Sequence, residues 1–265
     1  MNQSTIIQAN YSYWLVALSV LIAAFASYAA LDLSARVFSE EKGARGAWLL
    51  GGAVAMGTGV WSMHYTGMLA CRLPIPVFYH IPTVLLSLVA AIGASFVALY
   101  VVSRQKFGVL HIAAGSLLMA GGIAGMHYTG MAAMRLSAMH HWDRQLVIAS
   151  VVVAWLVSLA GLGLMKVNLV ISSRGRNGSE GMIKTVFAVT MGFAIPAMHY
   201  MGMAAVHYVP MDEAPDLRYS VEISALGNAA IIMISVIVLG SIFFVRHRSG
   251  GSRVAPVAIA AGQTH

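Results

Sequence analysis

Charged residues are scarce in this sequence: Asp, Glu, Lys and Arg together make up only 9% of its 265 residues. A soluble domain of ordinary composition carries about a quarter, so the scarcity excludes a typical soluble enzyme. Hydrophobic residues make up 59% instead. Because about 20 apolar residues cross the hydrocarbon core of a bilayer, the composition predicts a chain that crosses the membrane several times.

Cysteine is nearly absent as well, since Cys71 is the only one. One cysteine excludes an internal disulfide framework and any Cys-rich zinc or iron–sulfur site. The first ten residues lack the basic start of a signal peptide, so none is expected. We also find no Gly-rich phosphate loop and no paired carboxylates in an apolar segment, and we therefore expect no enzymatic activity.

The long apolar segments predict an all-α fold, a polytopic membrane bundle of seven transmembrane helices. The predicted spans are Trp14–Leu31, Ala47–Ala70, Thr83–Val102, Val109–Met134, Leu146–Met165, Thr185–Val206 and Ile223–Val245. We expect this membrane domain to cover residues 13–246. A short outer segment, residues 1–12, would precede it, and a disordered cytoplasmic tail, residues 247–265, would follow it.

The net charge of +7 predicts an orientation. If the N-terminus lies outside, only four of the 16 basic residues fall in outer segments: Arg72, Arg135, Arg144 and Arg218. Lys and Arg are enriched in cytoplasmic loops, so we place the N-terminus outside and the C-terminus in the cytoplasm. The basic balance thus indicates topology, and no nucleic-acid partner is predicted.

One short pattern occurs three times, on alternate predicted spans. The copies are Met63-His64-Tyr65-Thr66-Gly67-Met68, Met126-His127-Tyr128-Thr129-Gly130-Met131 and Met198-His199-Tyr200-Met201-Gly202-Met203. The separation between successive copies fits one helical hairpin each time, so all three would leave the membrane on the same, outer side. A histidine inside a membrane is costly and should face the bundle interior or a cavity.

The residue types in the three copies suit copper. Positions i, i+4 and i+7 share one helix face, which would group His64 with Met68 and Cys71, and His127 with Met131 and Met134. In the third copy His199 would lie with Met203, and Met201 adds another thioether. Imidazole and thioether together favour copper, whereas the absence of Asp and Glu argues against Mg, Ca and di-iron centres.

The same residues also fit purely structural roles. Histidine can join membrane helices by hydrogen bonds, and the motif glycines Gly67, Gly130 and Gly202 can allow helices to approach closely. Methionine commonly fills apolar gaps. The motif tyrosines could anchor the interface or hydrogen-bond a ligand or a histidine.

The triplicated Met-His-Tyr string resembles the MHYT domain family of bacterial integral membrane sensors, over roughly residues 13 to 246. The resemblance implies a seven-span module in the bacterial inner membrane that binds copper near the outer face and senses O2, CO or NO. The ligands it implies are the motif residues His64, His127, His199, Met63, Met68, Met126, Met131, Met198 and Met203. Secondary candidates are Cys71, Met134 and Met201.

In many members of this family, cytoplasmic domains for cyclic di-GMP turnover or other signalling outputs follow the module. No such domain follows the last predicted span here, so we expect that the module stands alone, is part of a longer protein, or signals through a separate cytoplasmic partner. Two alternatives stay open at this point. One is a haem-binding redox protein with paired histidines as axial ligands. The other is a transport protein for copper or protons. The number of metal ions and the oligomeric state stay undetermined.

Overall fold

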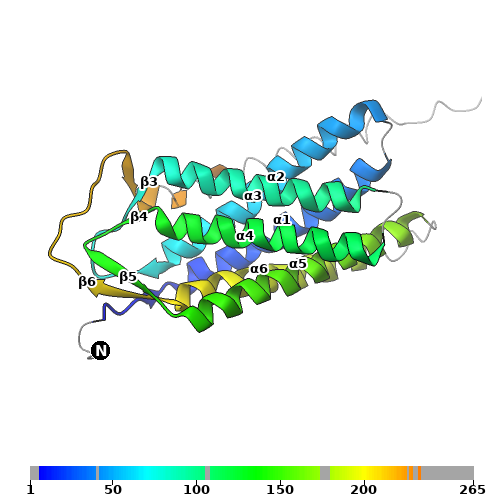
Figure 1. Ribbon diagram of the computed structural model, residues 1–265. Coiled ribbons are helices and arrows are strands. Elements are labelled where there is room, and N and C mark those ends of the chain that lie inside the picture. The colour runs from blue at the N-terminus through cyan, green and yellow to red at the C-terminus, as the bar shows by residue number, and fades with distance from the viewer. Residues whose placement is uncertain are drawn as a thin grey trace, which may run out of the picture.

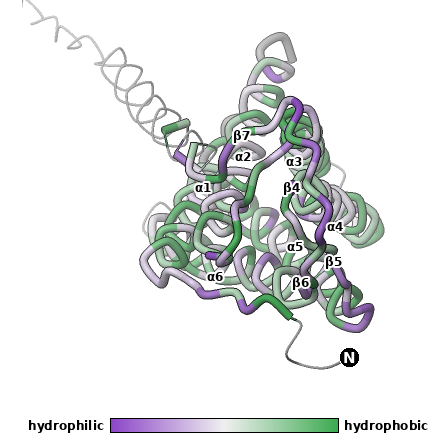
Figure 2. The backbone as a smooth tube through the Cα atoms, turned by 90° about the vertical axis from the view of Figure 1, so that its left-hand side faces the viewer, coloured by the Kyte–Doolittle hydropathy of each residue, from purple (hydrophilic) through white to green (hydrophobic). Residues whose placement is uncertain are grey.

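Six long helices form a closed ring in the computed structural model, which describes residues 6–39, 42–104, 108–173, 180–225, 227–228 and 232–233. They are α1 (Tyr13–Ser39), α2 (Lys42–Ala70), α3 (Ile81–Val102), α4 (Val109–Ala132), α5 (Arg144–Ser173) and α6 (Glu180–Ala204). Each helix packs on the next one in the chain, and α6 packs on α1. Figure 2 shows this arrangement from one end of the bundle.

Short strands cover one end of the bundle, which we call the strand end (Figure 1). They are β1 (Asn10–Tyr11), β2 (Cys71–Arg72), β3 (Phe78–His80), β4 (Met134–Arg135), β5 (Ala138–Trp142), β6 (Val206–Pro210) and β7 (Ser220–Glu222). The predicted all-α fold did not include them. Cys71 and Met134 therefore lie in strands and not on the helical stripes assigned to them, because α2 ends at Ala70 and α4 ends at Ala132.

The six helices are three copies of one unit, a helical hairpin whose open end is closed by two antiparallel strands. Unit 1 is β1–α1–α2–β2, unit 2 is β3–α3–α4–β4, and unit 3 is β5–α5–α6–β6. The same backbone hydrogen bond closes each unit: Ser12 N donates to Ala70 O (2.9 Å), His80 N to Ala133 O (2.9 Å) and Asp143 N to Ala205 O (2.8 Å). β7 lies outside this pattern and pairs with the free edge of β3.

Five of the helices are long and apolar enough to cross a membrane: α1, α3, α4, α5 and α6. α2 is equally long but carries six glycines besides the residues of the first motif, and these glycines and the polar motif residues lower its hydropathy. Of the seventh predicted span, Ile223–Val245, only a few residues belong to the described part of the chain. Five membrane-spanning candidates are thus found among the described residues, where seven spans were predicted.

The outside of the bundle is apolar, and small residues form many of the contacts between its helices. Large side chains such as Leu21, Phe25, Val89 and Phe193 are more than half exposed. Alanine and serine side chains lie buried between the helices, and a Cβ on Gly57 would lie 2.6 Å from the Ile92 backbone. Small residues between helices with apolar ones outside are typical of membrane bundles. The packing therefore agrees with the composition in indicating a membrane protein.

Candidate metal centre

The three motif helices α2, α4 and α6 alternate with α1, α3 and α5 around the ring, and each carries its motif near the strand end. His64, His127 and His199 each lie six residues before the alanine whose carbonyl closes the unit. They therefore occupy equivalent positions at one level of the bundle. The prediction that all three motifs would lie at the same end is confirmed.

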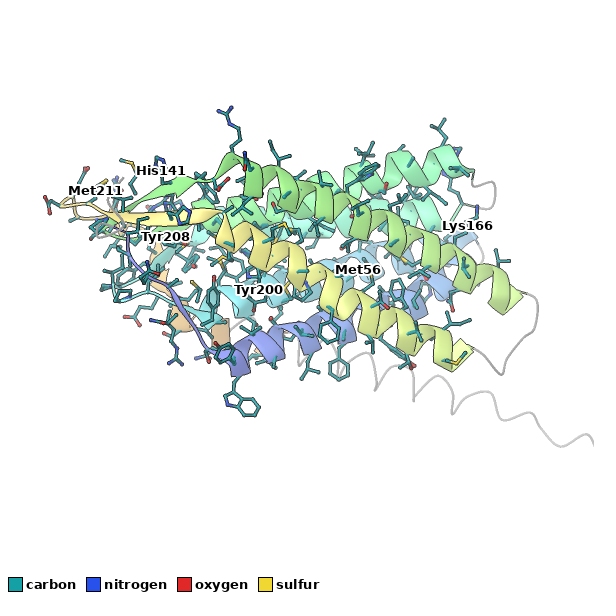
Figure 3. The ribbon with its side chains drawn as sticks, turned by 90° about the horizontal axis from the view of Figure 1, so that it is seen from below. Met56, His141, Lys166, Tyr200, Tyr208 and Met211 are labelled. Atoms are coloured by element: carbon teal, nitrogen blue, oxygen red, sulfur yellow. The ribbon has the colours of Figure 1, made fainter. Side chains whose placement is uncertain are left out.

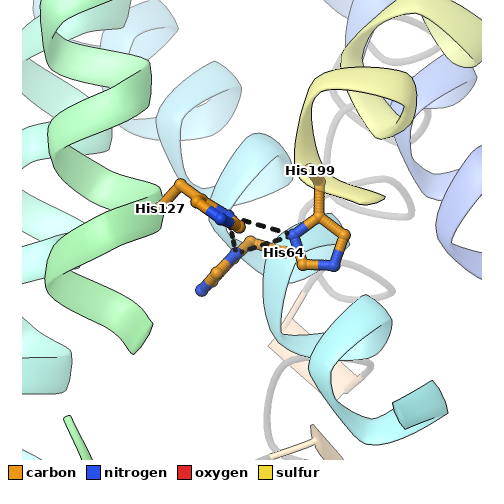
Figure 4. A group of neighbouring side chains, drawn as sticks. All are labelled: His64, His127 and His199. Atoms are coloured by element: carbon orange, nitrogen blue, oxygen red, sulfur yellow. Dashed lines mark hydrogen bonds between the residues drawn. The ribbon is translucent and has the colours of Figure 1, made fainter. Parts of the chain in front are cut away.

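The three histidine side chains converge on one point (Figure 4). The Nδ1 atom of His64 lies 3.1 Å from that of His199 and 3.3 Å from that of His127, and the His127 and His199 Nδ1 atoms are 3.2 Å apart. The rings meet edge to face, with centroids 5.0 to 5.1 Å apart. All three side chains are at most 1% exposed. The triad is thus a compact, buried set of nitrogen atoms.

The size of this triangle fits a metal ion. Three nitrogens separated by 3.1 to 3.3 Å leave a central point about 1.8 to 1.9 Å from each, close to the 2.0 to 2.1 Å of a zinc–imidazole bond. The structure thus brings together a histidine cluster that could hold a metal ion.

Hydrogen bonding alone leaves this arrangement incomplete. A neutral imidazole nitrogen is either a donor or an acceptor, and the three Nδ1 atoms all face one another. Whichever tautomers are chosen, at least one of the three contacts joins two donors or two acceptors. If all three nitrogens are acceptors, a cation at the centre satisfies every contact, which is the chemistry of a metal site.

The motif glycines make room for the rings. A Cβ on Gly67 would lie 2.3 Å from Nε2 of His199. A Cβ on Gly130 would lie at the same distance from Nε2 of His64, and a Cβ on Gly202 at the same distance from Nε2 of His127. Each histidine therefore projects onto the glycine of the next unit around the ring. The interpretation of these glycines as points of close approach is refined: here it is a histidine ring that occupies the space.

The motif tyrosines link the triad to the other three helices. Each packs edge to face on the histidine before it, with centroids 4.8 to 4.9 Å apart. Each hydroxyl then contacts a serine of the following unit: Tyr65 with Ser87 (3.2 Å), Tyr128 with Ser150 (2.5 Å) and Tyr200 with Ser19 (2.9 Å). These serines donate to the carbonyl three residues earlier, so the tyrosines are the donors.

Sequence reasoning did not identify these serines. The equal spacing of Tyr65 to Ser87 and of Tyr128 to Ser150 was available as a signal. The third pair breaks the spacing, because Tyr200 reaches back to Ser19 on α1, near the start of the described chain. Only the closed ring of helices explains that partner.

The predicted methionine ligands are all buried, and two of them line a cavity. Met63, Met68, Met126, Met131, Met198 and Met203 are no more than 3% exposed, whereas Met201 is partly exposed. The cavity, of about 480 Å³, lies at the strand end and has Met68, Met203, Met134 and Cys71 in its wall. Burial raises the pKa of the Cys71 thiol. Whether any of these sulfur atoms binds a metal stays a prediction.

Comparison with known proteins agrees with the repeats. The MHYT family model, described as a bacterial signalling protein N-terminal repeat, matches residues 57–115, 121–178 and 192–256. These matches begin inside the motif helices, so they are offset from the three structural units. No solved structure matches the chain.

Several curated signalling proteins are similar to the chain. The bifunctional diguanylate cyclase/cyclic di-GMP phosphodiesterase MucR of Pseudomonas aeruginosa is 42% identical over 201 residues, which is 75% of this chain and 28% of MucR. The cyclic di-GMP phosphodiesterase NbdA of the same organism is 36% identical over 86% of this chain and 29% of its own length. The signaling protein YkoW of Bacillus subtilis is 35% identical over 76% of this chain and 25% of its own length.

The chain thus spans less than a third of these relatives, and their activities are those of much longer proteins. What they share with it is the repeated motif region, which the family model matches over most of the chain. The protein therefore belongs to the MHYT family of bacterial membrane signalling proteins.

Proposed function

We propose that this protein is a sensory membrane module that holds one copper ion between His64, His127 and His199 and responds to a diatomic gas or to redox state. The observation that carries the proposal is the convergence of three buried Nδ1 atoms on one metal-sized point. Bound copper would supply an open coordination position for O2, CO or NO, or a one-electron change of charge. We assign the module no enzymatic activity of its own.

Copper is favoured over zinc by the surroundings of the triad. Three imidazoles suit either metal, but thioethers favour Cu(I), and each motif places a buried methionine on both sides of its histidine. In the described part of the chain, no Asp or Glu belongs to a histidine cluster of this kind. Met68 and Met203 also extend from the motif helices to the cavity at the strand end. We propose that a soft ion or a small gas would approach the triad from that side.

The residues around the triad provide a route for the signal. A change at the centre moves the imidazole rings, which pack directly on Tyr65, Tyr128 and Tyr200. These tyrosines hydrogen-bond to α3, α5 and α1 respectively. The motif helices and the helices between them would therefore move together, and a switch further requires two packing states whose balance the ligand changes.

The charge distribution supports an orientation with the strand end outside the cell, in the bacterial inner membrane. Four basic and five acidic residues belong to the segments at that end, and the remaining twelve basic residues lie in the other segments. Positive residues are retained in the cytoplasm. The signal would then reach a cytoplasmic output, either a domain of the same protein or a separate partner, as the names of the relatives suggest.

The test is metal content together with CO binding. The purified protein is loaded with Cu(I), washed and analysed by mass spectrometry of metals, and the CO stretching band is then recorded. We expect about one copper per chain, and loss of that copper in H64Q, H127Q and H199Q. His111 is exposed on α4, far from its motif, so H111Q is the matched control. Wild-type protein without copper after loading, or triad variants that retain it, would overturn the metal claim. Bound copper without a CO band would leave a metal site but refute gas sensing.

The haem alternative is not favoured by the geometry. With ring centroids about 5 Å apart and Nδ1 atoms in contact, the space between the histidines does not admit a macrocycle. The transport alternative is tested by copper uptake into vesicles. Uptake above that of the triad variants would replace the sensor with a transporter.

A further inference from the structure

The antiparallel ladder β5–β6 at the strand end places two histidines opposite each other. His141 on β5 pairs with His207 on β6, in a register that runs from Ala138↔Pro210 to Trp142↔Val206. Both side chains are exposed. This pair belongs to neither the triad nor the repeated motif.

The hydrogen bonds of the ladder fix the spacing of the pair. Asp143 N donates to Ala205 O (2.8 Å) and Met211 N donates to Ser137 O (3.0 Å). Because hydrogen-bonded and non-hydrogen-bonded pairs alternate, His141 and His207 form the hydrogen-bonded pair next to Asp143 and Ala205. Directly opposite residues have Cβ atoms about 4.5 to 5.5 Å apart and project on the same face. Two imidazoles so placed can each give one nitrogen to a single ion.

The other face of the ladder holds it in place. His140 stacks on Trp142 with centroids 6.1 Å apart and meets Tyr208 at 5.4 Å. Trp142 in turn packs on Tyr128 of α4, with centroids 5.5 Å apart. Alternation along a strand then requires His141 and His207 to face away from these contacts. The pair is therefore exposed on a fixed support.

The chemistry of the exposed face favours a metal cation. Neither strand contains Lys or Arg, so no positive side chain of the ladder opposes an ion. Met139 lies on the same face two residues before His141 and is 56% exposed, diagonal to His207 and within reach of a long side chain. Asp143 lies two residues after His141 and caps α5, because its Oδ1 accepts hydrogen bonds from Gln145 N and Leu146 N.

We propose that His141 and His207 form a second metal site, a surface chelate for a divalent transition-metal ion, most strongly Cu²⁺. Affinity for imidazole sites rises toward Cu²⁺ along the divalent series. The site is separate from the triad, and its existence does not depend on whether the triad binds copper. Its place at the strand end suits the capture of an ion arriving from the outer side.

The test measures Cu²⁺ binding to the intact purified protein by electron paramagnetic resonance, with CuCl₂ as the probe. Protection of His141 and His207 from diethyl pyrocarbonate is followed by peptide mass spectrometry. We expect a Cu²⁺ signal with nitrogen hyperfine structure and protection of both histidines. In H141A and in H207A the affinity should fall by about tenfold or more, because one of two ligands is lost. The change H111A on α4 is the control and should leave the affinity unchanged.

The two copper sites give separable results. The H64Q variant should retain the surface signal and its protection pattern even when it no longer holds Cu(I). Unchanged affinity in both H141A and H207A would overturn the surface chelate, and so would protection of neither histidine. Both positions are exposed and neither change removes buried surface, so we expect the variants to fold. Circular dichroism of the variants checks that a loss of affinity does not reflect unfolding.

Discussion

Each motif glycine sits against the histidine ring of the neighbouring unit, so a single methyl group decides whether the triad can form. A Cβ on Gly130 would lie 2.3 Å from the His64 ring. The ring cannot retreat without leaving the centre where the three Nδ1 atoms meet. Glycine is required here by space and not by backbone conformation.

Gly130→Ala should therefore destabilise the protein by about 1 to 3 kcal/mol, the usual cost of overpacking, and should abolish copper retention. The same helix offers a control, since a Cβ on Gly121 has nothing within 4 Å. Gly121→Ala should leave stability and copper content unchanged or slightly improve stability. Thermal unfolding in detergent and metal analysis measure both effects. Equal behaviour of the two variants would show that the glycine does not shape the site.

The three histidines of the site were predictable from the sequence, whereas the orientation of their rings was not. The register of His64, His127 and His199 was visible in the repeat and indicated a shared site. Which ring nitrogen faces the centre was not predictable, because it depends on the neighbouring unit's glycine and not on residues of the same helix.

At the scale of elements, the helices were predictable from apolar length, whereas their ends near the motifs were not. The predicted spans ran on to Met134 and Val206 because those residues are apolar. The structure ends α4 at Ala132 and α6 at Ala204, since the chain then pairs with β3 and β5. Strand pairing of so few residues leaves no periodic signal in the sequence.

The tyrosine–serine contacts connect one helix pair to the next, and they should transmit the ligand state. Tyr128→Phe removes the hydrogen bond to Ser150 while keeping the ring that packs on His127. We expect copper to be retained and stability to fall by only about 0.6 kcal/mol, as for other membrane hydrogen bonds. The change in α5 mobility on ligand binding should be reduced, which hydrogen exchange can measure. A response equal to that of the wild type would show that this contact carries no signal.

At the scale of the whole molecule, the predicted orientation can be tested with the two ends of the bundle. Met211 and Lys166 mark opposite ends in Figure 3. In a Cys71→Ala background, Met211→Cys should react with a membrane-impermeant thiol reagent in intact cells, because we place the strand end outside. Arg104→Cys, at the other end of α3, should react only after permeabilisation. The reverse pattern would invert the proposed topology.

The order of helices around the ring was beyond sequence reasoning. Three motif copies indicated a threefold repeat but not where each unit begins, and the family matches begin inside the motif helices. The structure instead begins each unit one helix earlier, so that α1 completes the ring beside α6. That closure depends on a contact between segments far apart in the sequence, Ser19 with Tyr200 among them.

The approximate threefold arrangement has a consequence for how a signal would leave the molecule. The point where the three Nδ1 atoms meet is nearly equidistant from all three units. We therefore expect a change at this point to displace all three hairpins to a similar extent, so that no single hairpin would carry the signal alone. A cytoplasmic domain attached at the end of any one hairpin would then receive a similar displacement. Different output domains could therefore be joined to the same membrane module without a change in its metal centre.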